Sequence, residues 1–246
     1  MGSFCFFQDS FKSFGIYTTI MVELQYFGHS FFQLKDANST ILIDPVFDSS
    51  KTDMKKQAKI PTKPSNLKKI SLILITNETA EHFDKTAVQE IALRDNSIVV
   101  GHDVVLQKLN IPRTQKATIY SNGEVNLRGV KVKSTTAHFP KSFYPLGYLV
   151  EMTGKKIYHA GVTSLHDSFE KIPSDIALLP ISSRTMDVVD AVRATKILKP
   201  RIVIPMQYDI FEQKKFDPKD FKRRIGESVL KTETVILSPG QKFKLD

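Results

Sequence analysis

The chain has 246 residues, a formal net charge of +9 and a hydrophobic content of 41%. These values are ordinary for a soluble globular protein and allow one α/β domain with a large buried core. The single cysteine, Cys5, excludes an internal disulfide and a metal centre built from thiolates. It suits a reducing compartment, so we expect a cytoplasmic protein. No segment approaches the roughly 18 apolar residues that are needed to cross a bilayer.

The positive charge favours anionic partners, but it is spread along the chain as lysine. A solvated surface is therefore one interpretation, and a binding face for an anionic small molecule is the other. We do not expect nucleic acid as a partner, although binding through the basic surface stays as an alternative. The sequence does not indicate the oligomeric state.

Residues 1–20 are rich in Phe and Ser, but Gln8, Asp9 and Lys12 interrupt any continuous apolar core of a signal peptide. We interpret them as an extension that is disordered or that results from an upstream start, with a targeting tail as the alternative. Residues 21–246 are expected to form a single domain of two halves, approximately 21–129 and 130–246.

The domain begins with three predicted strands at 22–26, 31–34 and 40–43. They are separated by segments rich in turn-forming residues. The third strand ends in Asp44, whose carboxylate is suited to cap local amides. Residues 51–69 then form a connector rich in lysine. It is an exposed loop with solvated cations or, alternatively, a clamp for phosphate.

Residues 71–92 combine a buried strand, a polar loop and a helix. Leu72–Ile75 is apolar throughout, as in a strand that is covered on both faces. Asp84 is a suitable N-cap for a helix that begins at Lys85 and has an apolar face. A polar loop between a buried strand and a helix is where α/β folds place their chemistry.

The rest of the chain continues with similar elements. We expect strands at 97–101, 117–120, 125–132, 130–135, 146–152, 156–159, 175–179 and 202–204, and helices at 103–109 and 188–198. Leu72 and Ile98 are 26 positions apart, and so are Ile176 and Ile202. This matched strand–helix–strand spacing indicates an internal duplication.

The polar loop and four other segments resemble the metallo-β-lactamase superfamily, and within it the small hydrolases similar to ascorbate-6-phosphate lactonase. The segments are Gly28-His29-Ser30, Ile41–Pro45, Ile75–His82, Tyr158–Thr163 and Ile204–Tyr208. Thr135–His138 matches a further element that supplies a histidine in that superfamily. The resemblance covers about Met21–Asp246. It implies a four-layer αββα sandwich in which the site lies along one edge shared by two sheets.

In that superfamily seven side chains hold two metal ions. The matching positions are Asn77, Thr79 and His138 for the first metal, Glu81, His82 and Gln207 for the second, and Val162 for the bridging aspartate. Only His82 and His138 are retained. Amide and hydroxyl oxygens are weak zinc ligands beside imidazole, and valine offers no ligand atom. The resemblance also implies that Asp44 supports the metal loop without touching a metal.

We therefore expect a hydrolase-like pseudoenzyme with a degenerate metal site, which has lost two-zinc hydrolysis and is inactive or only binds a ligand. No cofactor is expected. The alternative is a hydrolase of esters, lactones or phosphoesters with one divalent ion (Zn, Mn or Fe) on Glu81, His82, His138 and Gln207. In a further form of this alternative, His82 and His138 act as acid and base without a metal ion.

The sequence also suggests roles for three polar residues outside the seven positions. Arg184 follows the predicted strand 175–179 and is suited to hold a carboxylate or phosphate at the same edge. His29 and His159 stand within motifs of a structural character.

Overall fold

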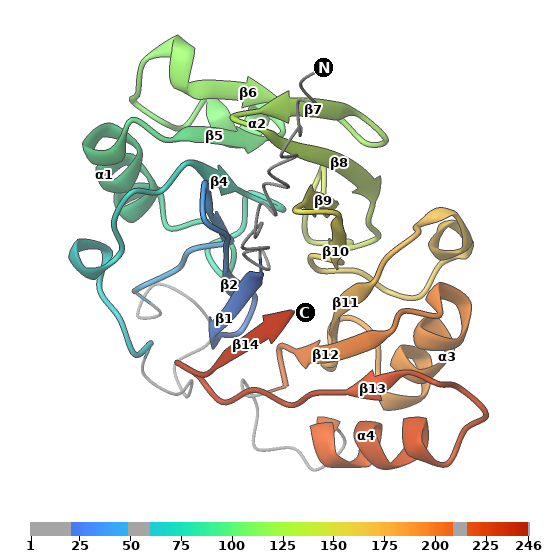
Figure 1. The fold of residues 1–246 in the computed structure, drawn as a ribbon. Coiled ribbons are helices and arrows are strands. Elements are labelled where there is room, and N and C mark those ends of the chain that lie inside the picture. The colour runs from blue at the N-terminus through green and yellow to red at the C-terminus, as the bar shows by residue number, and fades with distance from the viewer. Residues whose placement is uncertain (1–20, 49–59, 209–215, 246) are drawn as a thin grey trace, which may run out of the picture.

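The computed structural model describes residues 21–48, 60–208 and 216–245. The predicted extension 1–20 and the first part of the lysine connector, 51–59, lie outside the described residues. Two mixed sheets face each other, and helices lie on their outer sides (Figure 1). The expected αββα sandwich is therefore confirmed.

The first sheet has the strand order β14-β1-β2-β3-β4-β5-β6. Its strands are β1 (Val22–Gly28), β2 (Phe31–Lys35), β3 (Thr40–Ile43), β4 (Leu72–Leu74), β5 (Ile98–Gly101), β6 (Lys116–Thr118) and β14 (Lys242–Leu245). Pairing is antiparallel from β14 to β3 and parallel from β3 to β6. Every residue of β3 and β4 is buried, because parallel strands are covered on both faces.

The second sheet has the strand order β13-β12-β11-β10-β9-β8-β7. Its strands are β7 (Glu124–Leu127), β8 (Val130–Thr136), β9 (Leu146–Met152), β10 (Lys155–His159), β11 (Ile176–Pro180), β12 (Ile202–Met206) and β13 (Glu233–Thr234). Pairing is antiparallel from β7 to β10 and parallel from β10 to β13. The two sheets thus repeat one pattern, which agrees with a duplicated unit.

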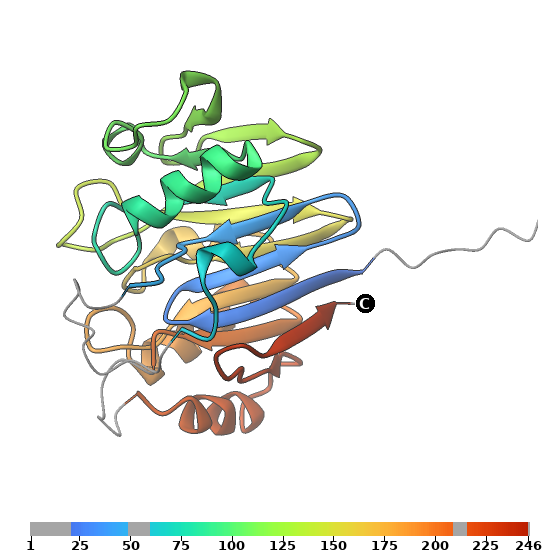
Figure 2. The same ribbon diagram turned by 90° about the vertical axis from the view of Figure 1, so that its left-hand side faces the viewer.

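The helices cover the outer faces of the sheets (Figure 2). They are α1 (Lys85–Asp95), α2 (Asp103–Leu106), α3 (Val188–Leu198) and α4 (Pro218–Gly226), with 3-10 turns at Pro64–Asn66, Arg113–Gln115 and Asp167–Lys171. α1 lies outside the first sheet, and α3 and α4 lie outside the second. Within the described residues, no helix combines the length and the apolar character that a membrane span requires.

Two predicted elements differ from the structure. The expected strand 125–132 is wrong as a single strand, because Arg128 and Gly129 turn the chain with φ of 51° and 79°. The strand separates there into β7 and β8. The expected helix 103–109 is wrong in length, since α2 ends at Leu106.

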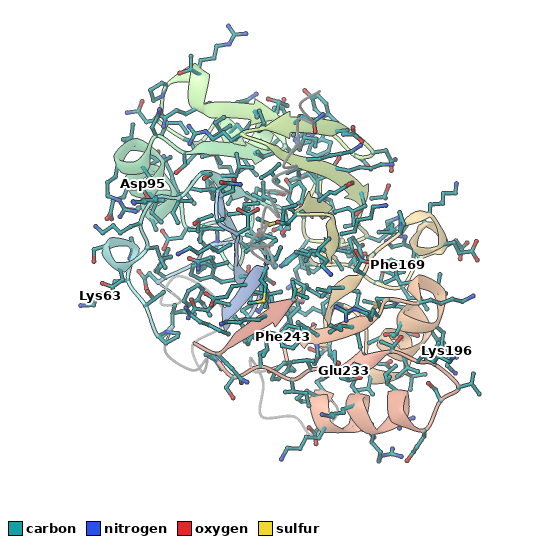
Figure 3. All side chains as sticks on the ribbon, viewed as in Figure 1. Lys63, Asp95, Phe169, Lys196, Glu233 and Phe243 are labelled. Atoms are coloured by element: carbon teal, nitrogen blue, oxygen red, sulfur yellow. The ribbon has the colours of Figure 1, made fainter. Side chains whose placement is uncertain are left out.

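Apolar side chains fill the space between the sheets (Figure 3). This central core contains Leu34 and Leu74 from the first sheet and Val150 and Ile157 from the second, all fully buried. A smaller cluster packs α1 against the first sheet through Val88 and similar residues. Burial of this kind is the main favourable contribution to folding.

Hydrogen bonds join the two sheets at the edge where β3, β4 and β12 end. The amide of Leu146 donates to the carbonyl of Thr76 at 2.8 Å, and the amide of Gln207 donates to the carbonyl of His29 at 3.1 Å. The Tyr148 hydroxyl donates to a carbonyl at the end of β4 over 2.7 Å. These contacts hold loops from both halves in one place.

The first prediction concerns Asp84, which caps α1 and fastens a second loop. Its Oδ1 accepts from the Ala87 amide at 3.1 Å, and its Oδ2 accepts from the amide of Phe47 at 3.2 Å. Asp84→Ala should lower the free energy of unfolding by about 1–2 kcal/mol, because the cap is lost. Chemical denaturation measures the change. Asp84→Asn keeps the cap and should lose clearly less; equal losses in the two variants would contradict the capping role.

Candidate functional site

Asp44 lies at the centre of the site and is almost completely buried. Its Oδ1 accepts from the Thr76 amide at 2.8 Å, and its Oδ2 accepts from the Thr76 hydroxyl at 2.6 Å. The same Oδ2 lies 2.6 Å from Nδ1 of His82. An ionised carboxylate in this position selects the His82 tautomer that carries its proton on Nδ1. Nε2 is then the nitrogen with a lone pair.

Asn77 and Thr79 hydrogen bond to each other inside the loop that follows β4. Oδ1 of Asn77 accepts from the Thr79 amide at 3.0 Å and from the Thr79 hydroxyl at 2.6 Å. Nδ2 of Asn77 donates to the Thr76 hydroxyl at 3.2 Å. Two bonds occupy both lone pairs of the Asn77 oxygen, so these two side chains close the loop on itself.

Glu81 and Arg184 form an ion pair that joins the loop of the first half to the second half. Nη1 of Arg184 donates to Oε1 of Glu81 at 3.2 Å, and both side chains are partly exposed. Arg184 thus brings a permanent positive charge to the carboxylate that remains in the loop.

Gln207 and Val162 occupy the remaining substituted positions. Nε2 of Gln207 donates to the Ser30 hydroxyl at 2.7 Å and to the Gly161 carbonyl at 3.1 Å. Val162 is 4% exposed and places an apolar side chain where the resemblance expects a bridging carboxylate. The structure therefore brings these positions to one edge but fills them with groups that bond to the protein itself.

His138 is exposed and belongs to a different group of rings. Its imidazole stacks on His166 at a centroid distance of 4.6 Å, and His166 stacks on Phe169 at 4.3 Å. The contacts found among the described residues link His82 to Asp44 and to His29, and none of them links His82 to His138. The suggested acid–base pair of His82 and His138 stays a prediction.

His159 is a buried structural histidine. Its Nε2 donates to the Ser30 carbonyl at 3.0 Å, and its Nδ1 accepts from the Gly161 amide at 3.1 Å. Burial lowers the pKa of His159 from its usual value. The ring is therefore neutral near pH 7, with its proton on Nε2, and holds the strand β10 against the Gly28-His29-Ser30 turn.

His29 is a site residue for which the sequence predicted only a structural role, within the Gly28-His29-Ser30 motif. Its ring lies 5.0 Å from the ring of His82, and both of its ring nitrogens are buried without a hydrogen-bond partner. Burial, followed by the charges of His82, His159 and Arg184, holds the pKa of His29 well below its usual value. Only its place in a turn before a strand was visible in the sequence, and a turn predicts no partner.

The residues present do not fit the two-metal centre that the resemblance implies. Within residues 21–48, 60–208 and 216–245, no three His, Cys, Asp or Glu side chains gather in a way that could hold a metal ion. The Asn77 oxygen is occupied by Thr79, and Val162 has no donor atom. No reaction step that uses two metal ions can be assigned to this arrangement.

The second prediction concerns the tautomer of His82. Asp44→Asn replaces an acceptor that faces Nδ1 with an amide, so the proton of His82 should move from Nδ1 to Nε2. Nitrogen-15 NMR of the imidazoles distinguishes the two forms. His159, whose tautomer the Ser30 carbonyl sets, is the internal control and should not change. A His82 proton on Nε2 in the unsubstituted protein would contradict the assignment.

The third prediction is that stability falls as the pH decreases below about 6.5. His29 and His159 have lowered pKa values in the folded protein, whereas the unfolded chain protonates both near pH 6.5. The unfolded state then binds more protons, and each histidine contributes up to about 1.4 kcal/mol per pH unit. Denaturation in chelator from pH 7.5 to 5.5 measures the slope.

His29→Asn is the matched variant for that measurement, because asparagine tolerates the left-handed backbone at this position (φ of 52°). The free energy of unfolding of this variant should depend less steeply on pH, by up to about 1.4 kcal/mol per pH unit. An unchanged slope would show that His29 does not contribute.

Comparison with known proteins finds relatives along nearly the whole chain. A UPF0173 metal-dependent hydrolase from Pyrobaculum calidifontis is 32% identical over 234 residues, which cover 91% of this chain and 100% of the relative. The UPF0173 metal-dependent hydrolase from Staphylothermus marinus is 34% identical over 236 residues, which cover 91% of this chain and 99% of the relative.

These relatives correct the expectation that no cofactor is involved. Both are named as metal-dependent hydrolases, which points to a divalent metal ion as the cofactor of such proteins. The expectation is therefore wrong. It rested on the seven superfamily positions alone, and those positions do not include every imidazole at the site.

Solved structures and the domain match agree on the fold. Igni18, a metallo hydrolase from Ignicoccus hospitalis, has a TM-score of 0.77 and 27% identity, over 92% of this chain and 99% of that protein. The metallo-β-lactamase fold protein YhfI from Bacillus subtilis has a TM-score of 0.68 over 91% of this chain and 99% of its own, and at 12% identity it shows the fold alone. The β-lactamase superfamily domain matches residues 23–207. The chain thus belongs to the metallo-β-lactamase superfamily, among relatives named as metal-dependent hydrolases.

Proposed function

We propose that this protein has lost two-metal hydrolysis and uses its site to bind an anionic small molecule. The observation that carries the proposal is the bonding of Asn77 to Thr79. These residues stand at two of the three positions for the first metal, and each satisfies the other. The third residue of that set, His138, stacks on His166 instead.

Loss of the first metal removes the chemistry of a dinuclear centre. Two ions that share a bridging carboxylate stabilise the attacking and the leaving oxygen together. The bridging position holds Val162, which is buried and cannot bind a cation.

The proposed partner is an anionic small molecule, because fixed positive charge remains at the site. Arg184 lies against the loop, and its charge reaches His29, whose pKa it helps to lower. A guanidinium is always ionised and matches the shape of carboxylate and phosphate groups. The net charge of +9 supports the same choice of partner.

A second candidate function is favoured by the pairing of Asp44 and His82 at 2.6 Å. A histidine with its Nδ1 proton held by a carboxylate is suited to act as a general base through Nε2. Hydrolysis of an ester, lactone or phosphoester by His82, alone or with one metal ion, would follow. His82→Ala should abolish any such turnover, and an unchanged rate would exclude this candidate.

The fourth prediction tests the loss of two-metal hydrolysis. Chelator-stripped protein titrated with Zn²⁺, Mn²⁺ or Fe²⁺ should bind fewer than two equivalents, because the first-metal and bridging positions lack donors. Lactone, phosphodiester and thioester substrates should show no metal-dependent hydrolysis. Binding of two equivalents together with metal-dependent turnover would contradict the proposal.

A restored variant is the matched control for this experiment. It carries Asn77→His, Thr79→His, Glu81→Asp, Val162→Asp and Gln207→His. If the flanking backbone still has the superfamily geometry, this variant should bind two equivalents of the metal ion per chain. Titration of the unsubstituted protein and of Arg184→Gln with inorganic phosphate tests the partner, and Arg184→Gln should bind at least about tenfold more weakly.

A further inference from the structure

The buried ring of His29 lacks hydrogen-bond partners, which destabilises the folded protein. A buried polar group without a partner destabilises a protein, and such groups in native proteins require an explanation. Both ring nitrogens of His29 are in this state, and the residue has a left-handed backbone with φ of 52°. A ring that is held in place and unsatisfied is suited to receive a ligand.

The backbone fixes the position of the His29 ring from two sides. The His29 carbonyl accepts from the Gln207 amide at 3.1 Å and from the Tyr26 hydroxyl at 3.3 Å. The first bond reaches β12 in the second sheet, and the second returns to β1 in the first. Contacts to both sheets therefore hold the backbone of His29 in place, and its ring lies 5.0 Å from the ring of His82.

The spacing of His29 and His82 matches two ligands of one metal ion. With Zn–N of about 2.0–2.1 Å and tetrahedral angles, two imidazoles on one ion have ring centres about 5 Å apart. The observed centroid distance is 5.0 Å, with an angle of 57° between the ring planes.

His82 is also prepared as a metal ligand by its neighbour. Metal-binding histidines commonly donate their second N–H to a carboxylate, which orients the ring and makes it a stronger ligand. Asp44 makes this contact with Nδ1 of His82 at 2.6 Å. The remaining nitrogen, Nε2, then carries the lone pair that a metal ion would bind.

The charges around the two rings permit a bound cation. The Asp44 carboxylate is buried directly behind His82, with Oδ2 2.6 Å from Nδ1. The nearby positive charge of Arg184 is paired with Glu81 at 3.2 Å, which reduces its repulsion of a cation. The Arg184 charge still lowers the pKa of His29 and so works against a bound cation, whereas the Asp44 carboxylate behind His82 works in its favour.

We propose that His29 and His82 together bind one divalent transition-metal ion, whose remaining positions are filled by water. Imidazole ligands select Zn²⁺, Co²⁺, Ni²⁺ or Cu²⁺ over Mg²⁺ and Ca²⁺. Two protein ligands are fewer than a structural zinc site has, so the affinity is modest and positions stay open for a ligand. His29 is outside the seven superfamily positions, and this inference does not rest on the proposed loss of two-metal hydrolysis.

Cobalt titration of the chelator-stripped full chain tests this site, since Co²⁺ bound to nitrogen ligands gives visible absorption. The unsubstituted protein should bind one Co²⁺ per chain, which Zn²⁺ displaces. His29→Asn and His82→Ala should each weaken binding by at least about tenfold. His29→Asn suits the left-handed backbone, so it is the variant most certain to fold. Thermal unfolding should show that Zn²⁺ raises the Tm of the unsubstituted protein but not that of His29→Asn.

His138→Ala is the matched control, because His138 is an exposed histidine of the superfamily set and should not affect binding. Binding of one Co²⁺ with the same affinity in His29→Asn as in the unsubstituted protein would overturn this inference. Loss of Co²⁺ binding in His138→Ala alone would also overturn it. Absence of any metal binding would overturn it and leave the proposed loss of two-metal hydrolysis in place. Two equivalents on the unsubstituted protein that persist in His29→Asn would count against both.

Discussion

The buried carboxylate of Asp44 is the contact on which the site depends. It accepts from the Thr76 amide and hydroxyl and binds Nδ1 of His82, so one side chain joins the end of β3, the end of β4 and the following loop. A charge in the interior is tolerated only when it is fully hydrogen-bonded. The three contacts satisfy that requirement, and they also decide which nitrogen of His82 faces other groups.

Five of the seven superfamily positions have changed in a way that keeps the fold and alters the bonding. Asn77 and Thr79 bond to each other, Glu81 pairs with Arg184, and Gln207 donates to Ser30. Side chains that would converge on a cation in a metal centre bond here to the protein. The loop keeps its shape because internal hydrogen bonds supply the cohesion that a metal ion supplies elsewhere. The names of the relatives nevertheless point to a metal ion, and His29 offers an imidazole that the superfamily pattern does not include.

Much of the fold could be predicted from local patterns. The buried run at 72–75 and the N-cap Asp84 indicated the parallel strands and α1, because burial and capping leave a signature within a few residues. The division of β7 from β8 was missed, since Arg128 is an ordinary residue that adopts a left-handed turn only with Gly129. α4 was also missed, although Asp217 followed by Pro218 is a typical helix start. The contacts of His29 could not be predicted, because neighbours such as His82 and Gln207 are far from it in the sequence.

The return of β14 to the first sheet affects how the protein can be made. β14 pairs with β1, with Val22 opposite Leu245, so the two strands that form one edge are separated by almost the entire sequence (Figure 1). During synthesis, β1 and its neighbour β2 leave the ribosome long before β14 exists, so the edge of β1 that β14 later covers stays unpaired. Such an edge can pair with other chains until it is covered. A tag or fusion that delays pairing of the last strand would therefore promote aggregation of the nascent protein even where the mature fold is stable.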